Sequence, residues 1–255
     1  MQLRAPQLRA PQLRTVRNVP NGWLIYYRII SGYRVNYTIL EAFHSIFLAD
    51  HNEIWIIWSD LFPLIYFVYE FYHHLYADTL HLKYGLLFGI MTSRICSIIY
   101  HVFNCVSLQI NQTLLYVDLI GIANMAFGSP YMYAKIIGYD GLERYCALLF
   151  GLYMIVVGTY TYLFYRQIPY YNTVAISQAL IVMLGAVGNL PLLYLSEYDN
   201  TFVYANVSIL SGYVLFYLGR LPERFMSNGS TDGKIYNSHV LWHCAVFASQ
   251  YYYLK

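Results

Sequence analysis

Seven apolar stretches of about 20 residues each follow one another between residues 54 and 254, and they constrain the fold more than any other feature. A helix of about 20 residues crosses the roughly 30 Å of hydrocarbon in a lipid bilayer. Backbone groups inside lipid must be hydrogen-bonded within the protein, which favours helices for such stretches. We therefore expect membrane-spanning helices at residues 54–76, 84–105, 114–133, 145–165, 174–195, 202–221 and 238–254.

The composition agrees with a chain that lies mostly in lipid. Hydrophobic residues make up 58% of the 255 positions, and charged residues only 11%. A typical soluble domain carries roughly 25% charged residues. The net charge of +2, without a basic stripe along any helix, predicts no nucleic-acid partner. The expected fold class is an all-α membrane protein with seven transmembrane helices, whose principal partner is the lipid bilayer.

The residues before the first span divide into two parts. Residues 1–22 contain a basic QLRAP repeat with no acidic group, which predicts a disordered tail. Residues 23–53 form a juxtamembrane segment, and residues 54–255 form the transmembrane domain. Apolar residues at helical spacing predict short amphipathic helices in the juxtamembrane segment. These residues are Trp23, Leu24, Ile25, Ile29, Ile30, Leu40, Phe43, Ile46 and Phe47.

The distribution of basic residues predicts the orientation, because Lys and Arg gather on the cytoplasmic side. With the N-terminus inside, ten basic residues face the cytoplasm: Arg4, Arg9, Arg14, Arg17, Arg28, Arg34, Arg166, Arg220, Arg224 and Lys234. Four face outward: Lys83, Lys135, Arg144 and Lys255. We therefore expect a cytoplasmic N-terminus and an outer C-terminus.

Histidines mark a candidate metal site at the inner boundary. His239 and His243 are four residues apart at the start of the last span, so both imidazoles lie on one helix face. His101 lies near the inner end of the second span, at the same predicted depth. Three histidines and a water molecule make the open tetrahedral site of a catalytic zinc ion. The pattern predicts zinc bound by His101, His239 and His243.

Two further polar residues lie at this depth and suggest catalysis. Asp118 begins the third span, and Ser97 precedes His101 by one helical turn. Zinc lowers the pKa of a bound water to about 7, and Asp118 could accept its proton or orient it. Ser97 could hydrogen-bond that water or a substrate oxygen. Asp118 and Ser97 are therefore the candidate catalytic residues.

Other interpretations of the same residues stay open. A single histidine at a membrane boundary often only extends its polar end toward water. Asp118 could pair with Arg94, and Ser97 could bond back to a helix carbonyl. Cys105 follows His101 by four residues, and as a fourth ligand it would close the site into a structural zinc centre.

Several short motifs occur in a fixed order around the spans. They are ISGYR at 30–34, SIF at 45–47, HNE at 51–53, Ser97 with His101, Asp118, PERF at 222–225, and Ser238 with His239 and His243. In these motifs the chain resembles the progestin and adipoQ receptor family, which is related to the haemolysin III-like membrane proteins and more distantly to the alkaline ceramidases. The resemblance extends over about residues 25–254.

The resemblance implies a seven-helix receptor with a cytoplasmic N-terminus, most often in the plasma membrane, with internal membranes as the alternative. It also implies a zinc ion held by His101, His239 and His243, with Asp118 bound through water. Residues 31–34 and 187–191 look closer to the membrane progestin receptor branch.

The chain also departs from the family pattern. Trp58, Ser59 and Asp60 stand where the family usually has a second histidine shortly after its HNE motif, and Val240 stands where it usually has a glutamine. Neither departure removes a zinc ligand.

Two functions from different classes fit these observations. The first is a receptor for a steroid, lipid or adipokine ligand, in which zinc clamps the helices together and a signalling partner binds on the cytoplasmic side. The alternative is a ceramidase-like hydrolase, in which zinc activates a water that attacks a lipid amide and Asp118 acts as base and then acid. Both functions need the same polar residues.

Overall fold

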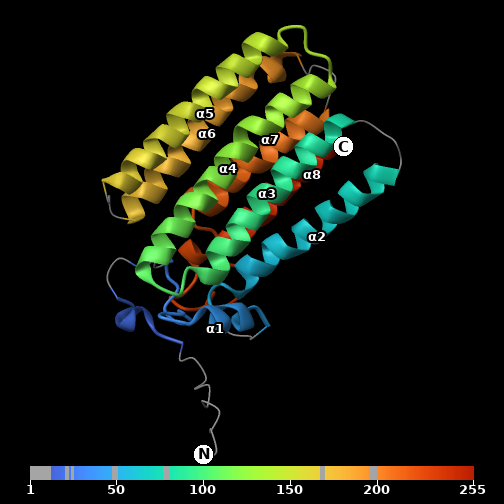
Figure 1. The fold of residues 1–255 in the computed structure, drawn as a ribbon. Coiled ribbons are helices and arrows are strands. Elements are labelled where there is room, and N and C mark those ends of the chain that lie inside the picture. Colours follow the sequence, from blue (N-terminus) through green and yellow to red (C-terminus); the bar gives the residue numbers. More distant parts are fainter. Residues whose placement is uncertain are drawn as a thin grey trace, which may run out of the picture.

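The computed structural model describes residues 13–20, 23, 26–47, 51–76, 81–166, 170–195 and 200–255. Long helices make up the body of the described chain, and these residues form no β-strand (Figure 1). The helices are α2 (Ile54–Tyr76), α3 (His81–Phe103), α4 (Leu108–Ile136), α5 (Leu142–Tyr165), α6 (Tyr170–Leu195), α7 (Asn200–Gly212) and α8 (Ser238–Leu254). Each predicted span has its helix, which confirms the all-α fold class.

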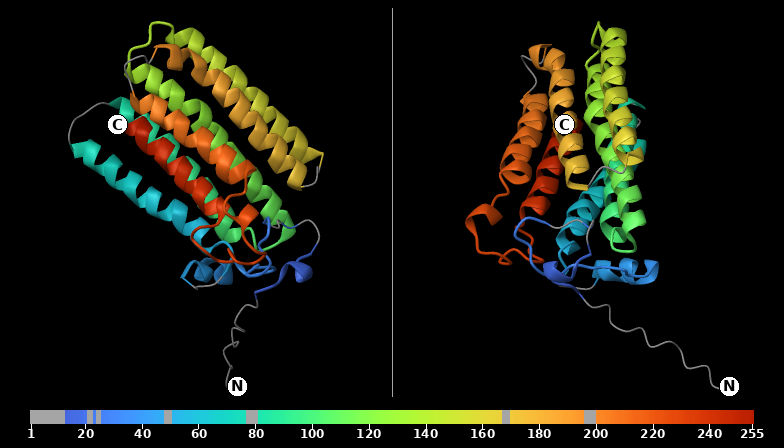
Figure 2. Two further views of the ribbon diagram at one scale, coloured as in Figure 1. Left: turned by 180° about the vertical axis from the view of Figure 1, so that it is seen from behind. Right: turned by 90° about the vertical axis from the view of Figure 1, so that its left-hand side faces the viewer.

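The helices pack side by side in one bundle. α3 lies along α4, α7 lies along α8, and α2 packs on α3 and α8 (Figures 1 and 2). α5 and α6 pack against each other and against α4. α7 continues as a π-helical turn, η3 (Tyr213–Leu218), before the loop that leads to α8. Because α3 ends and α8 begins at the same end of the bundle, the predicted histidines can meet there.

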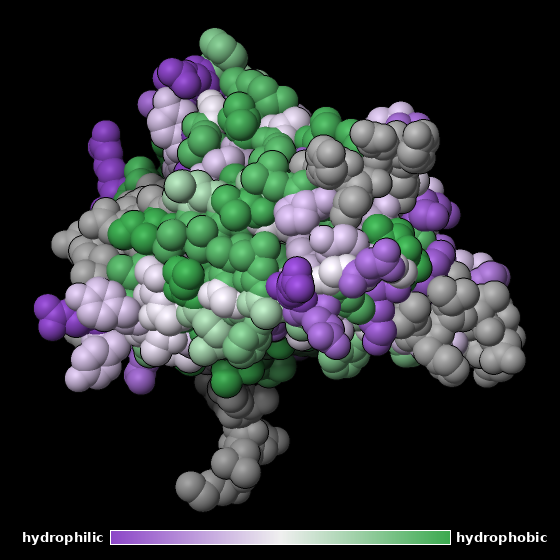
Figure 3. Space-filling model, turned by 90° about the horizontal axis from the view of Figure 1, so that it is seen from above, coloured by the Kyte–Doolittle hydropathy of each residue, from purple (hydrophilic) through white to green (hydrophobic). Residues whose placement is uncertain are grey.

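Hydropathy alone identifies only part of this bundle as membrane-spanning. Among the described residues, four helical segments are long and apolar enough to cross a bilayer: Ile54–His73, Lys83–Phe103, Leu142–Tyr165 and Asn200–Phe225. A shorter apolar helix covers Ile176–Leu192. α4 and α8 are not among these segments, and they carry polar residues such as Asp118 and His243, which are buried inside the bundle. Many large apolar side chains of the helices are exposed, and apolar residues occupy the middle of the face seen in Figure 3.

The juxtamembrane segment forms one short helix of the kind expected, α1 (Ile39–His44), across one end of the bundle (Figures 1 and 2). Thr38 and Glu41 close its first turn as a capping box, since the Glu41 amide donates to Thr38 Oγ1 over 3.2 Å. The hydrogen bonds from Thr38 lower the pKa of Glu41. Ile39 and Leu40 are exposed, which suits a helix on a membrane surface.

The earlier part of this segment differs from the amphipathic helix that we expected. Residues 26–36, which we call the strap, form an irregular chain that crosses the end of the bundle. Arg28, Gly32 and Asn36 have φ angles of 58°, 82° and 57°, and an α-helix does not accommodate such angles. Two apolar residues of the strap, Ile29 and Tyr33, are buried.

The tail before the strap is described only in part. Residues 1–12 and 21–22 of the predicted disordered tail lie outside the described residues. Residues 13–20 contact the strap. The amide of Arg14 donates to the carbonyl of Tyr33 over 2.8 Å, and η1 (Val16–Asn18) follows directly.

Candidate metal centre

Three histidines meet at the end of the bundle next to the strap. His101 lies in the last turn of α3, and His239 and His243 lie in the first two turns of α8. One nitrogen of each ring lies within 4.8 Å of one nitrogen of each other ring. His101 and His243 are 1% and 6% exposed. The convergence predicted from helical spacing and topology is therefore confirmed.

The start of α8 sets the position of two of these rings. Asn237 caps the helix, because its side-chain oxygen accepts the Val240 amide over 2.9 Å. The carboxylate of Glu223 accepts the next amide, that of Ser238, over 2.5 Å. These caps fix where the helix begins. His239 and His243 then lie one turn apart on the same face, with ring centroids 4.9 Å apart.

Glu53 lies behind the first histidine. Its Oε2 lies 2.8 Å from His101 Nδ1, and its Oε1 accepts hydrogen bonds from Tyr26 and Asn104. Burial alone would raise the pKa of Glu53, but the neighbouring His101 and Arg34 outweigh it and lower that pKa to about 2. Glu53 is therefore an ionised acceptor, which favours the His101 tautomer with a proton on Nδ1 and a free Nε2.

Asp60 lies behind His243, as Glu53 lies behind His101. Its Oδ2 lies 2.9 Å from His243 Nδ1 and accepts a hydrogen bond from Ser97 over 2.7 Å. Its Oδ1 forms an ion pair with Arg94, whose Nε donates to Gln250 over 2.8 Å. Asp60 is only 1% exposed. A buried carboxylate thus lies within ion-pair distance of His243 and is itself held by two donors.

The hydroxyl of Ser97 has a protein acceptor in the structure. We expected its hydroxyl to donate to a water or a substrate oxygen, with a helix carbonyl as the alternative. A serine hydroxyl has a single proton, and Asp60 accepts that proton in the structure. Ser97 therefore supports His243 through Asp60 and does not also donate to a substrate oxygen in this arrangement.

Asp118 approaches the centre from α4 and is 7% exposed. Its Oδ1 has no hydrogen-bond partner among the described residues. Arg94 pairs with Asp60 instead, so the alternative pairing of Asp118 with Arg94 is not the one that the structure adopts. A buried carboxylate oxygen without a hydrogen-bond partner lowers the stability of the fold. Such an oxygen is therefore expected to contact a ligand or to take part in a reaction.

Cys105 does not join the centre in the way that the closed-site alternative requires. It is 1% exposed, and its thiol donates to the carbonyl of Val102 over 3.5 Å. It packs with Tyr37 and Ala42 in an apolar cluster below the strap. The metal-ligating group found among the described residues contains the three histidines without this thiol.

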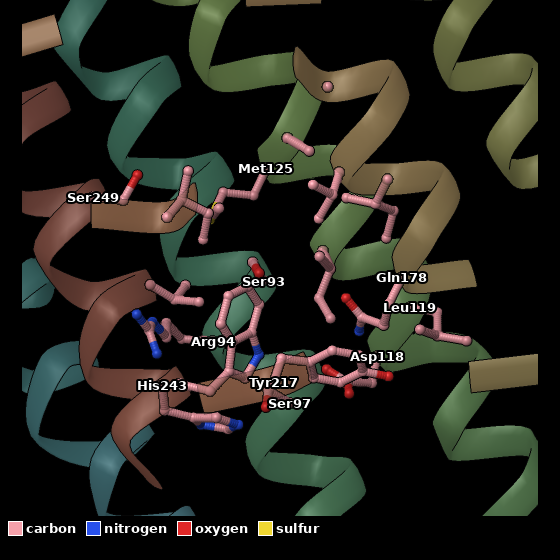
Figure 4. A pocket seen from close by; sticks show the side chains of 18 of the residues that line it. Ser93, Arg94, Ser97, Asp118, Leu119, Met125, Gln178, Tyr217, His243 and Ser249 are labelled. Carbon is pink, nitrogen blue, oxygen red and sulfur yellow. The ribbon is translucent and has the colours of Figure 1, made fainter. Parts of the chain in front are cut away.

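A cavity of about 280 Å³ extends from the centre into the bundle. His243 and Asp118 approach its lower part from α8 and α4, and Tyr217 from η3 lies between them (Figure 4). The rest of the wall is mainly apolar and comes largely from α4, α6, α7 and α8. The wall includes Leu190 of α6 and Leu210 of α7, which are 60% and 42% exposed. Side chains of α6 and α7 that are exposed on the molecular surface therefore also line the cavity.

The residues present fit a zinc ion. Three imidazoles form a ligand set that zinc prefers, and a carboxylate lies behind two of them. His239 Nε2 is buried and has no hydrogen-bond partner among the described residues. A metal ion would give that nitrogen the partner that it lacks.

The sequence did not predict that Glu53 and Asp60 would lie behind the histidines or that Arg94 would pair with Asp60. A signal for two of them was present, because Asp60 and Arg94 are charged residues within predicted apolar spans. Charged groups at such positions usually pair with one another. Glu53 precedes the first span directly, and only the observed rotation of α2 shows that it reaches His101.

The part of the chain that is similar to known proteins includes every residue of the candidate metal centre. A family model described as "Haemolysin-III related" matches residues 48–254. Heptahelical transmembrane protein 1 of Arabidopsis thaliana is 26% identical over 245 residues, which is 86% of this chain and 72% of that protein. The three histidines, both supporting carboxylates and Asp118 all lie within the residues that the family model matches.

Proposed function

The chain belongs to the haemolysin III-related family, and we propose that it is a zinc-dependent membrane hydrolase that cleaves an amide bond of a lipid. One observation carries this proposal. Asp118, whose Oδ1 has no hydrogen-bond partner among the described residues, and the three histidines lie at the end of a mainly apolar cavity. A centre that served only to hold helices together would need neither the cavity nor this carboxylate oxygen.

His101, His239 and His243 would hold the metal ion, and Glu53 and Asp60 would fix the orientation of two of these rings. Bound zinc supplies the chemistry of such sites by lowering the pKa of water to about 7 and by polarising a carbonyl group. Three protein ligands leave a coordination position for water or substrate.

Asp118 would move the proton. Its Oδ1 has no described partner and lines the same cavity as the histidines, so it is available to accept a proton from the attacking water. The same carboxyl group would then return the proton to the nitrogen of the leaving amine. Ser97 does not take part directly, because its hydroxyl donates to Asp60.

The shape of the cavity supports a lipid substrate. Its wall is mainly apolar, and exposed residues of α6 and α7 form part of it. An acyl chain could enter from the bilayer between these two helices and bring its carbonyl group to the histidines. The amide is the linkage implied by the resemblance to alkaline ceramidases.

The membrane and the orientation also belong to the proposal. The family and the apolar helices make the chain a multi-pass integral membrane protein. We propose the plasma membrane, with internal membranes as the alternative. The excess of basic residues on one side supports a cytoplasmic N-terminus, which would place the metal centre near the inner face.

A receptor is the second candidate function. It is favoured by the positions of the helices that carry the three histidines. The histidines come from α3 and α8, and the cavity contacts both of these helices together with α4, α6 and α7. A steroid or lipid in the cavity would therefore touch helices that the metal ion joins. Its binding could shift those helices and be sensed by a partner on the cytoplasmic side.

The variant Asp118→Asn separates the two candidates. We expect it to keep zinc and lose at least about 100-fold in the hydrolysis of a fluorescent ceramide in detergent micelles, because the proton acceptor is gone. A receptor would keep both its zinc and its ligand response in this variant. Asp140→Asn removes an exposed carboxylate outside the centre and serves as the matched control. Equal hydrolysis by Asp118→Asn and wild type would refute the hydrolase mechanism.

A further inference from the structure

Tyr26, a residue of the strap, touches two of the elements that build the metal centre. Its hydroxyl donates to Glu53 Oε1 over 2.9 Å. Its ring meets the ring of His239 edge to face, with centroids 5.2 Å apart and an interplanar angle of 68°. One side chain from outside the bundle thus contacts the carboxylate behind His101 and a second candidate ligand.

The two carboxylate oxygens of Glu53 contact different residues. Oε1 accepts hydrogen bonds from Tyr26 and from Asn104, and Oε2 faces His101 Nδ1. The terminal torsion of a glutamate has broad energy wells, so the carboxylate can turn unless its oxygens are held. The two donors on Oε1 therefore determine where Oε2 points, and with it the orientation of His101.

Hydrogen bonds from Arg34 join the strap to the last turn of α3. The guanidinium of Arg34 is buried, and its Nη2 donates to the carbonyl of His101 over 2.6 Å. Its Nη1 donates to the hydroxyl of Ser45 over 2.5 Å. A fixed charge on the strap thus holds the last turn of α3, which carries the first ligand.

The strap is also tied to the loop before α8. Arg28 Nη1 donates to the carbonyl of Met226 over 2.7 Å, and the Gly229 amide donates to the carbonyl of Arg28 over 2.8 Å. Asp232 accepts the hydroxyl of Ser31 over 2.5 Å. The strap therefore bridges the end of α3 and the entry to α8, which supply all three histidines (Figures 1 and 2).

We propose that Tyr26 is a positioning residue for the metal centre, through which docking of the strap and retention of the metal ion stabilise each other. This inference rests on the proposed zinc site. Tyr26 acts through Glu53 on His101 and through ring contact on His239. Because coupling between two events is reciprocal, bound metal holds the strap in place to the same degree that the docked strap holds the metal.

The variant Tyr26→Phe tests the hydroxyl while the ring remains. Purified wild type and variant are compared by competition with a chromophoric zinc chelator and by the rate of zinc release into excess chelator. We expect zinc affinity to fall about 10-fold, the lower end of the range for partners that orient a metal ligand. Tyr27→Phe is the matched control, because Tyr27 is the next residue and is 46% exposed.

A second readout separates positioning from simple packing. Cobalt substituted for zinc reports the ligand geometry in its visible absorption, and we expect Tyr26→Phe to alter that spectrum. The melting temperature of the metal-free protein should stay the same in variant and wild type. The double variant Tyr26→Phe with Glu53→Gln should bind zinc no more weakly than Glu53→Gln alone. The effects of two substitutions on zinc affinity are not additive when one residue acts through the other.

The outcomes distinguish the inference from the function on which it rests. A wild-type protein that binds no zinc overturns both. If wild type binds zinc, and Tyr26→Phe has the same zinc affinity, zinc release rate and cobalt spectrum, the role of Tyr26 is overturned. The zinc site itself is then still supported. Additive effects of Tyr26→Phe and Glu53→Gln overturn the route through Glu53.

Discussion

Asp60 Oδ2 lies 2.9 Å from His243 Nδ1, so a carboxylate that is 1% exposed stands directly behind a candidate metal ligand. Glu53 stands in the same relation to His101, at 2.8 Å. Both carboxylates come from the beginning of α2 or the residue before it, whereas the histidines come from α3 and α8. The first two turns of α2 and the residue before it therefore supply carboxylates behind the candidate ligands, whereas the histidine group found among the described residues contains no residue of α2.

Replacing Asp60 by Asn should weaken zinc binding. Asn cannot supply the negative charge that favours a proton on His243 Nδ1, and loss of such a partner costs about 10- to 100-fold in metal affinity. Competition with a zinc chelator measures the effect. The exposed Asp140→Asn serves as control, and equal affinity of Asp60→Asn and wild type would contradict the orienting role of Asp60.

Replacing Arg94 by Met should destabilise the bundle. Asp60 would keep its buried charge and lose the guanidinium that neutralises it, and breaking a buried pair in this way costs roughly 3–5 kcal/mol. Thermal unfolding in detergent should show a clear drop in melting temperature for Arg94→Met. The double variant with Asp60→Leu should recover part of that drop, and a single variant as stable as wild type would show that the pair is not needed.

His51 should make stability depend on pH. It is 2% exposed, and burial together with the charge of Arg34 lowers its pKa from 6.5 to about 4. Above pH 6.5 the ring is neutral in both the folded and the unfolded chain. As the pH falls from 6.5 to 4 the unfolded chain takes up a proton first, so the folded state loses stability.

The variant His51→Gln isolates this effect. The amide can replace the hydrogen bond that His51 Nε2 makes with the carbonyl of Ser45 at 2.9 Å, and it does not titrate. Unfolding midpoints at pH 7.5, 6 and 5 should fall less steeply in the variant than in wild type. Parallel pH profiles would show that His51 does not carry the dependence.

Replacing Arg28 by Met should loosen the loop before α8. Arg28 Nη1 donates to the carbonyls of Glu223, Arg224 and Met226, and these bonds would be lost. Limited proteolysis should therefore cut faster within residues 226–236, because an unanchored loop opens more often. Arg224→Met keeps the backbone carbonyls and serves as the control, so equal cleavage of both variants would count against this anchoring.

The sequence predicted the bundle well, because the length of an apolar stretch sets the length of a spanning helix. The expected bounds 54–76 and 238–254 are those of α2 and α8. Helical spacing and the alternating direction of the spans also predicted that His101, His239 and His243 would meet, and they do.

The surroundings of the histidines were harder to predict. The contacts that Glu53 and Asp60 make with His101 and His243 depend on how far α2 is rotated against α3 and α8, and periodicity does not determine that rotation. The strap was expected to be helical from its apolar residues. Its conformation is determined by contacts distant in the sequence, such as those of Arg28 with residues 223–226.

The zinc content of the purified protein tests the central claim most directly. Wild type is compared with the double variant His239→Ala with His243→Ala. The double variant His44→Ala with His73→Ala is the control, since it removes two exposed histidines outside the centre. We predict about one zinc ion per chain in wild type and control, and none in the first double variant, because two of three ligands are gone. Wild type without zinc, or equal zinc in all three proteins, would contradict the account.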